Sequence, residues 1–150
     1  MSEYTKQAEK ALKLAEAFSR DLGHGYIGTE HLLLGLLEEG TGVAAKVLTS
    51  NKVQRAAVLA LIQKQIAPPS NVTLKERDGY SPKAQQIIHN CKSEAKRFRA
   101  SQIGTEHILL ALLRDVDNLA VRLLNTLSAN IQKIYIDISP NKTYRWATGT

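Results

Sequence analysis

Ile27-Gly28-Thr29-Glu30-His31 occurs a second time in this chain as Ile103-Gly104-Thr105-Glu106-His107, 76 residues further on. A run of six apolar or small residues follows each copy, at residues 32–37 and 108–113. Self-similarity at a fixed spacing predicts two copies of one supersecondary unit, each with an apolar face that the other copy completes. Any site that one copy builds is therefore expected in the other copy too.

The same register extends beyond the repeated pentapeptide. Tyr4-Thr5 aligns with Tyr80-Ser81 at the same offset, and no gap is needed between the two halves. The loop after the apolar run is where the copies differ, because residues 116–119 are Val-Asp-Asn-Leu whereas residues 40–43 are Gly-Thr-Gly-Val.

Each half begins with the pattern of an amphipathic helix. Apolar residues recur at three- and four-residue spacing: Ala8, Ala11, Leu12, Ala15, Phe18 and Leu22 in the first half, and Ala84, Ile87, Ile88, Cys91, Ala95 and Phe98 in the second. Thr5 and Ser81 stand where the N-caps of these helices belong. Pro82 supports this assignment, since proline is preorganised for the first helical position.

The remaining helices follow from apolar runs and glycine breaks. Thr29 and Thr105 are expected to cap the two apolar helices, which should end near Glu38 and Arg114. Two further helices are predicted in the first half, at residues 43–49 and 53–66. In the second half, the corresponding helices are predicted after Asp117, one ending at Leu127 and one at residues 130–138. The sequence thus predicts an all-α fold, with two pseudo-symmetric four-helix repeats, eight helices in all, packed as one domain.

The predicted domain organisation is a first repeat at residues 1–66 and a second repeat at residues 80–138. Residues 67–79 contain adjacent prolines and several turn formers, so they are expected to form the connecting loop. The tail, residues 139–150, is polar and lacks a helical period, and we expect it to be disordered.

The composition is that of an ordinary globular domain, with 43% hydrophobic and 23% charged residues. Apolar runs of six residues fall short of the roughly 20 that a membrane span requires. Residues 1–20 lack a secretory signal pattern. These features predict a cytoplasmic protein without a membrane partner. The single cysteine, Cys91, excludes an internal disulfide, and its helical spacing predicts a buried thiol.

The net charge of +6 favours acidic partners in general. Aromatic residues amount to only 5%, the basic residues are scattered among 14 acidic ones, and no nucleic-acid-binding motif is present. Nucleic acid is therefore not an expected partner.

Together with residues 40–48 and 80–84, the paired Gly-Thr-Glu-His makes the chain resemble the double Clp N-terminal repeat. This is the domain that receives substrates and adaptors at the front of ClpC-type AAA+ unfoldases. The resemblance covers about residues 3–138, and it implies the same all-α double repeat. It also implies binding of adaptor proteins and, as in Gram-positive bacteria, of arginines phosphorylated on the guanidinium.

Phosphoarginine binding requires an anion site next to a carboxylate. A hydroxyl at a helix N-terminus suits the phosphoryl group, and a glutamate can accept hydrogen bonds from the guanidinium. The positions that match the family are Thr5 with Glu30, and Ser81 with Glu106. Both pairs are 25 residues apart, so each repeat is expected to assemble its own site, with a partly exposed glutamate at the start of a helix.

The same four residues can also be interpreted as purely structural, without a ligand. Thr5 and Ser81 are suitable as plain N-caps, and Glu30 and Glu106 would be favoured in the first turn of a helix by its dipole. From spacing alone, both readings remain open.

His31 and His107 are predicted to be structural, bonding across the junction between loop and helix, because neither has a second ligand at metal spacing. No metal, cofactor or catalytic residue is expected. A hydrolase using Glu30 or Glu106 as a base with the adjacent histidine is an alternative. It is disfavoured because adjacent side chains on a helix diverge by about 100°.

The phosphate-loop pattern G-x-x-x-x-G-K-[ST] does not occur in the 150 residues. We therefore predict a non-enzymatic binding module that delivers phosphoarginine proteins and adaptors to an AAA+ ring, in cis or in trans. The alternative that uses the same site is a free-standing regulator, which would sequester phosphoarginine proteins without an ATPase partner.

Overall fold

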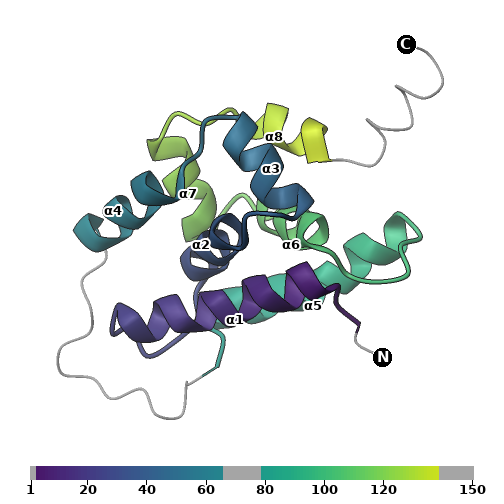
Figure 1. Cartoon of the computed structure of the whole chain (residues 1–150), viewed down its shortest axis with the longest axis horizontal. Helices are drawn as coiled ribbons and strands as arrows, with labels where there is room; N and C mark the ends of the chain where they lie inside the picture. Colours follow the sequence, from purple (N-terminus) through teal and green to yellow (C-terminus); the bar gives the residue numbers. More distant parts are fainter. Residues whose placement is uncertain (1–2, 66–78, 139–150) are drawn as a thin grey trace.

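The computed structural model describes residues 3–65 and 79–138, which form eight α-helices (Figure 1). In chain order these are α1 (Lys6–Asp21), α2 (Thr29–Glu39), α3 (Val43–Ser50), α4 (Arg55–Gln65), α5 (Pro82–Arg97), α6 (Thr105–Arg114), α7 (Leu119–Thr126) and α8 (Ile131–Ile138). The predicted all-α fold of two four-helix repeats is confirmed. Apart from Gly79, the predicted connecting loop lies outside the described residues, as does the predicted disordered tail at residues 139–150.

The N-caps predicted for the two long helices are confirmed. Thr5 Oγ1 accepts a hydrogen bond from the Ala8 N–H at 3.1 Å, and Ser81 Oγ accepts one from the Ala84 N–H at 3.2 Å. Cys91 is fully buried on α5, and this burial raises the pKa of its thiol to about 12. The thiol is therefore a packing group and not a nucleophile.

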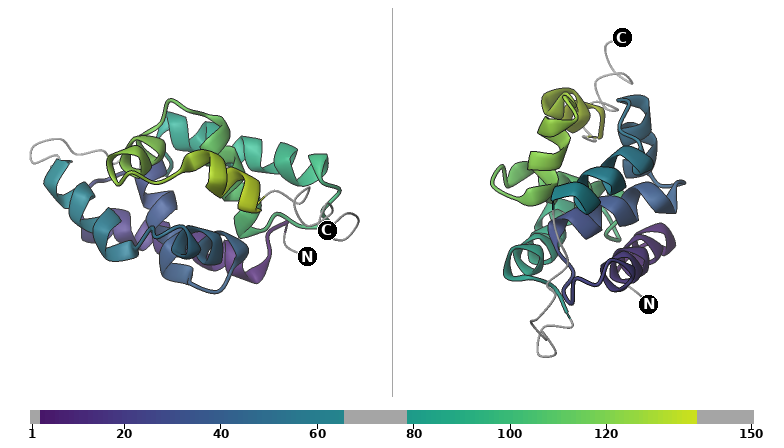
Figure 2. Two further views of the ribbon diagram at one scale, coloured as in Figure 1. Left: turned by 90° about the horizontal axis from the view of Figure 1, so that it is seen from above. Right: turned by 90° about the vertical axis from the view of Figure 1, so that its left-hand side faces the viewer.

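Helices α2 and α6 form the centre of the molecule, with the other helices around them (Figure 2). Each of the two packs against six other helices. This explains their sequences, because a helix buried on every side needs apolar residues on every side. The core packing predicted for residues 32–37 and 108–113 is confirmed, since all of these residues are buried. No helix in the described part of the chain is long and apolar enough to cross a lipid bilayer.

The two repeats contact each other reciprocally. Helix α2 packs against α7 and α6 packs against α3, while α1 contacts α6 and α5 contacts α2. The buried apolar residues of both halves belong to one continuous cluster. As predicted, each copy completes the apolar face of the other, and the pattern of contacts is that of a pseudo-twofold axis between the repeats.

The prediction that Thr29 and Thr105 cap their own helices is wrong. Both central helices begin after an N-cap glycine, and the threonine is their first residue. The Thr29 hydroxyl accepts a hydrogen bond from the Ala120 N–H in α7, and the Thr105 hydroxyl accepts one from the Ala44 N–H in α3, both at 3.2 Å. Each threonine therefore satisfies a free N–H at the start of a helix in the opposite repeat.

Loss of either threonine hydroxyl should destabilise the whole domain. We expect Thr29→Val and Thr105→Val each to lower the free energy of unfolding by about 1–3 kcal/mol, because a buried N–H of the other repeat loses its acceptor. Urea unfolding measures this, with Thr49→Val on the exposed face of α3 as the matched control. If both variants were as stable as the control, the two hydroxyls would have no structural role.

The loop that differs between the copies starts its helix by a different route. Asn118 is the N-cap of α7: its Oδ1 accepts from the Val121 N–H at 3.0 Å, and its Nδ2 donates to the Leu112 carbonyl at 2.9 Å. In the first repeat, the N-cap of α3 is Gly42, whose N–H donates to Glu39 Oε1 at 2.7 Å. The sequence change at residues 116–119 therefore preserves the start of the third helix.

Candidate functional site

The segments that enter α1 and α5 are exchanged between the repeats. The Thr5 N–H donates to the Ile103 carbonyl at 3.0 Å, and the Ser81 N–H donates to the Ile27 carbonyl at 2.9 Å. Both contacts belong to short parallel β-bridges. Each hydroxyl N-cap therefore lies beside the loop that leads into the central helix of the other repeat.

This exchange changes the pairing of the predicted site residues. Ser81 and Glu30 line the same cavity, of about 310 Å³, while the bridge to Ile103 sets Thr5 beside the segment that leads to Glu106. The structure therefore brings Ser81 to Glu30 and Thr5 to the segment of Glu106, whereas the prediction from the sequence pairs Thr5 with Glu30 and Ser81 with Glu106 within one repeat. We call the two composite arrangements the Ser81–Glu30 site and the Thr5–Glu106 site.

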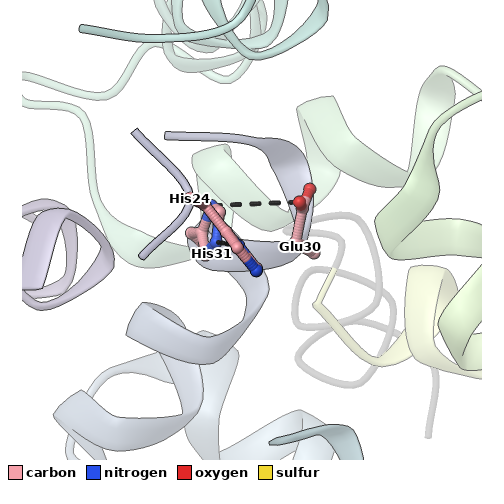
Figure 3. Close-up of side chains that lie close together, drawn as sticks. All are labelled: His24, Glu30 and His31. Atoms are coloured by element: carbon pink, nitrogen blue, oxygen red, sulfur yellow. Dashed lines mark hydrogen bonds and ion pairs between the residues drawn. The ribbon is translucent and has the colours of Figure 1, made fainter. Parts of the chain in front are cut away.

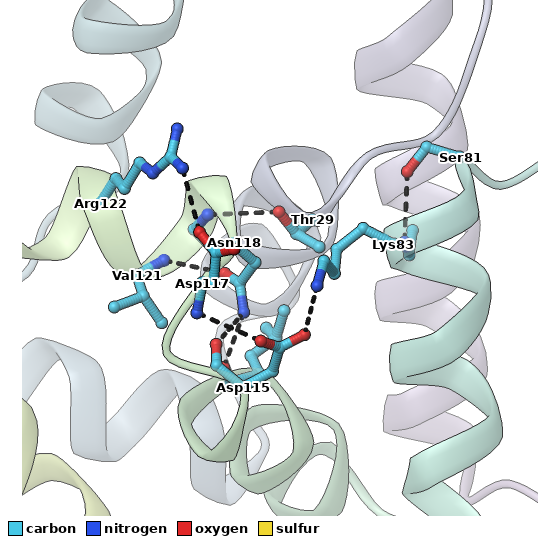
Figure 4. A network of polar contacts seen from close by, with 11 residues as sticks. Thr29, Ser81, Lys83, Asp115, Asp117, Asn118, Val121 and Arg122 are labelled. Atoms are coloured by element: carbon cyan, nitrogen blue, oxygen red, sulfur yellow. Dashed lines mark hydrogen bonds and ion pairs between the residues drawn. The ribbon is translucent and has the colours of Figure 1, made fainter.

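Charged side chains lie on the Ser81 side of the Ser81–Glu30 site, and Figure 4 shows Lys83, Arg122 and their aspartate partners there. Lys83 from α5 and Arg122 from α7 both line its cavity. Lys83 Nζ lies 3.0 Å from Asp115 Oδ2, and Arg122 Nη2 lies 3.0 Å from Asp117 Oδ1. The two cations are thus held at the cavity by aspartates of the loop that differs between the repeats.

The two glutamates adopt the same conformation. A Cβ atom placed on Gly28 would overlap Glu30 Oε1, and one on Gly104 would overlap Glu106 Oε1. Each carboxylate therefore folds back over the N-cap glycine of its own helix, a position that the helix dipole favours. Their exposure differs: Glu106 is half-buried as predicted, but only 2% of Glu30 is exposed, so its predicted partial exposure is wrong.

Tyr26 covers Glu30. Its hydroxyl donates a long hydrogen bond of 3.4 Å to Glu30 Oε2. Burial raises the pKa of the Glu30 carboxyl, although a backbone hydrogen bond and the bond from Tyr26 act in the opposite direction. Burial and the nearby carboxylate together raise the pKa of Tyr26 to about 12, so the phenol remains a hydrogen-bond donor at neutral pH.

The histidines of the pentapeptide accept hydrogen bonds from the N-cap N–H groups. His31 Nδ1 accepts from Gly28, and His107 Nδ1 accepts from Gly104, both at 2.8 Å. Because a backbone N–H can only donate, the proton of neutral His31 lies on Nε2, from which it is donated to His24 Nδ1 at 2.7 Å (Figure 3). The predicted structural role of both histidines is confirmed.

His24, Glu30 and His31 offer ligand atoms within 4.8 Å of one another. The facing imidazole nitrogens are 2.7 Å apart, closer than the roughly 3.3 Å between two nitrogens that each hold zinc at 2.0–2.1 Å. Burial and then His24 lower the pKa of His31 to about 3. The 4.0 Å approach of His31 to Glu30 is therefore no ion pair at neutral pH, and the arrangement suits a hydrogen-bonded core better than a metal site or a general base.

A family model of the Clp repeat (R) N-terminal domain matches residues 3–78 and matches again at residues 79–143. The chain belongs to the Clp N-terminal repeat family. The family assignment agrees with the eight observed helices and with the two copies in one register.

Full-length relatives of this Clp repeat domain are much longer. The protein named negative regulator of genetic competence ClpC/MecB from Bacillus subtilis is 36% identical over 98% of this chain, which corresponds to 18% of that protein. The chaperone protein ClpB from Oceanobacillus iheyensis is 38% identical over 87% of this chain and 16% of its own length. The chain thus spans less than a fifth of either relative.

Solved structures have the same fold. The N-terminal domain of ClpD from Arabidopsis thaliana superposes with a TM-score of 0.74 at 21% identity, covering 91% of this chain and 94% of that one. The N-domain of ClpV from Vibrio cholerae superposes with a TM-score of 0.73 at 18% identity, covering 96% and 84%.

Three side chains that line the Ser81–Glu30 cavity of this Clp repeat domain were not predicted from the sequence, namely Tyr26, Lys83 and Arg122. A signal for the first of them was available. In the 76-residue register Tyr26 aligns with Gln102, so the copies differ only four residues before the repeated glutamate. Such a difference inside a well-repeated segment marks a position where two equivalent sites have diverged.

Substituting Glu30 should not weaken the Clp repeat domain at neutral pH. Its raised pKa means that the folded state holds this proton to higher pH than the unfolded state does, so wild-type stability should fall as pH rises through that range. We expect Glu30→Gln to lose this contribution and to be at least as stable as wild type at pH 7. Urea unfolding between pH 4 and 8 measures the free energy of unfolding of both proteins, with Glu16→Gln, a substitution of an exposed glutamate, as control. If Glu30→Gln lost more than about 1 kcal/mol of unfolding free energy at pH 7, burial would not be the largest influence on the Glu30 pKa.

His31 should have the opposite effect on stability. Between its ordinary pKa of 6.5 and its lowered pKa of about 3, the folded state binds fewer protons than the unfolded state, so stability falls as pH falls. In the Glu30→Gln background, we expect His31→Gln to flatten this acid branch of the curve of unfolding free energy against pH. An unchanged slope would show that His31 protonates in the folded domain.

Proposed function

We propose that this domain binds arginine residues phosphorylated on the guanidinium, one in each composite site, and presents the proteins that carry them to an AAA+ unfoldase. The observation that carries the proposal is the meeting of Ser81, Glu30, Lys83 and Arg122 at one cavity. Phosphoarginine joins an anionic phosphoryl group to a guanidinium that still donates hydrogen bonds. A receptor for it needs both signs of charge a few ångströms apart.

In the Ser81–Glu30 site, the phosphoryl group would lie at the N-terminus of α5. The Ser81 hydroxyl and the positive end of the helix dipole favour an anion there, and Lys83 and Arg122 add charge from the rim. The guanidinium would turn towards Glu30 and form a charge-assisted pair with it. The aspartates that now hold the two cations are the groups that the phosphoryl group would compete with.

The Thr5–Glu106 site offers the same chemistry with a different rim. In the 76-residue register, Gln7 takes the place of Lys83 and Lys46 takes the place of Arg122. The hydroxyl cap and the glutamate are both retained. We therefore expect two sites per chain with unequal affinities.

Relatives support the role in delivery. Several of them are named chaperones or ATP-binding subunits of Clp protease, among them the ClpA homologue of Guillardia theta, which is 37% identical over 87% of this chain and 16% of its own length. A structure of the ClpV N-domain in complex with a VipB peptide has a TM-score of 0.70 at 19% identity, covering 97% of this chain and 86% of that one. We propose that this domain likewise docks adaptors and marked substrates, for a ring joined to it in cis or met in trans.

Titration calorimetry with phosphoarginine tests both the ligand and the composite pairing. We expect two sites in the wild-type domain. In the Glu106→Ala background one site should remain, and Ser81→Ala should weaken it about tenfold, as loss of a hydrogen bond to a charged group implies. Thr5→Ala should not weaken binding in that background. In the Glu30→Gln background only the Thr5–Glu106 site remains, so Thr5→Ala should weaken binding and Ser81→Ala should not.

Arginine and phosphoserine are the matched ligand controls, and neither should give comparable heat. Equal binding of phosphoserine would remove the role assigned to the glutamates. Full phosphoarginine binding by the variant that lacks both carboxylates would exclude these positions as the site. Weakening by Thr5→Ala in the Glu106→Ala background would contradict the composite pairing.

A further inference from the structure

Two glutamates with the same local sequence and the same conformation differ in exposure. Glu30 is 2% exposed and Glu106 is half-buried, although both fold back over their N-cap glycines. The pentapeptides around them are identical. The cause of the difference therefore lies outside the pentapeptide. The residue directly before it is Tyr26 in one copy and Gln102 in the other, and Tyr26 contacts Glu30.

Tyr26 is held in place from three sides. Its ring stacks on His24 with centroids 5.9 Å apart and meets His31 edge-on at 5.7 Å. Its backbone carbonyl accepts a hydrogen bond from the Ser19 hydroxyl. From this position its own hydroxyl reaches Glu30, at the edge of the cavity that both residues line.

The second repeat lacks two of these three supports. In the 76-residue register Ser19 aligns with Ala95 and His24 aligns with Ala100, neither of which can form the corresponding contact. Gln102 has its Nε2 directed to the Tyr4 carbonyl at 3.3 Å. At the position that corresponds to Tyr26, the Thr5–Glu106 site therefore has an amide side chain and no aromatic ring.

We propose that Tyr26 is a gate on the Ser81–Glu30 site: its ring and hydroxyl cover Glu30 until an incoming guanidinium displaces them, so the ungated Thr5–Glu106 site fills first. The inference rests on the proposed phosphoarginine function. Before the guanidinium can pair with Glu30, the bond from Tyr26 must break and the ring must leave the two histidines. A site that is open only part of the time binds with an affinity reduced by its open fraction.

The residues of the two repeats supply the matched variants. Tyr26→Gln copies the second repeat into the first, and Gln102→Tyr does the reverse. In the Glu106→Ala background, calorimetry should show Tyr26→Gln binding phosphoarginine about fivefold more tightly than its parent, a gain consistent with release of one long hydrogen bond. Gln102→Tyr in the Glu30→Gln background should bind more weakly than its parent. Tyr26→Gln in the Glu30→Gln background is the control and should change nothing.

A cation can also stack on an aromatic ring, and this alternative predicts the opposite sign. Weaker or unchanged binding in Tyr26→Gln would overturn the gate, and weaker binding would assign Tyr26 to the ligand instead. Tyr26→Phe keeps the ring and removes only the hydroxyl, so it should give a smaller gain. It also preserves the packing on the histidines, should the glutamine variant fail to fold.

A measurement without ligand separates the gate from the proposed function. Carboxyl carbon NMR follows the titration of Glu30 in Tyr26→Phe and in Tyr26→Gln, because both variants lack the hydroxyl whose hydrogen bond lowers this pKa and only the second lacks the ring. Uncovering the carboxylate should lower its pKa towards the ordinary value, because burial is the largest cause of its present shift. If this pKa falls but phosphoarginine binds neither site, the cover is correct and the ligand is wrong. If the pKa does not fall, Tyr26 is not the cover, whatever the ligand.

Discussion

Two parallel backbone bridges determine the architecture of this domain. One joins the segment before α1 to the loop before α6, and the other joins the segment before α5 to the loop before α2, with two N–H to carbonyl hydrogen bonds in each. Because each bridge connects opposite repeats, the first helix of each half enters the structure beside the central helix of the other half. The reciprocal helix packing and both composite sites depend on this exchange.

The two repeats have the same backbone fold, but their loops place different side chains around the two glutamates. The first repeat places tyrosine and two histidines around its glutamate, and burial there raises the pKa of the carboxyl. The second repeat leaves its glutamate half-buried. A carboxylate kept in a place that disfavours its charge is a typical sign of function, since natural proteins accept lower stability at the positions that bind.

Most of the fold was predictable from the sequence, because helical periodicity, hydroxyl N-caps and apolar runs are local signals. The long-range pairings were not. A 76-residue offset is the same whether Thr5 meets Glu30 or Glu106, so the repeat carries no information on which partner is adjacent. The hydroxyl of Thr29 has a local use as a cap and a distant use as an acceptor for Ala120, and only the packed structure distinguishes them. The contact of Tyr26 with Glu30 depends on a ring position that packing against two histidines sets.

The threonine hydroxyls that serve the opposite repeat make each repeat incomplete on its own. A single repeat would leave the first turn of its third helix without this acceptor and the apolar sides of its central helix in water. A second identical copy, related by a twofold axis, would supply both. One repeat made as a separate chain would therefore need a symmetric homodimer to reach the same architecture. In the present chain the loops around the two glutamates differ, whereas both threonines keep the hydroxyl that each lends to the other repeat.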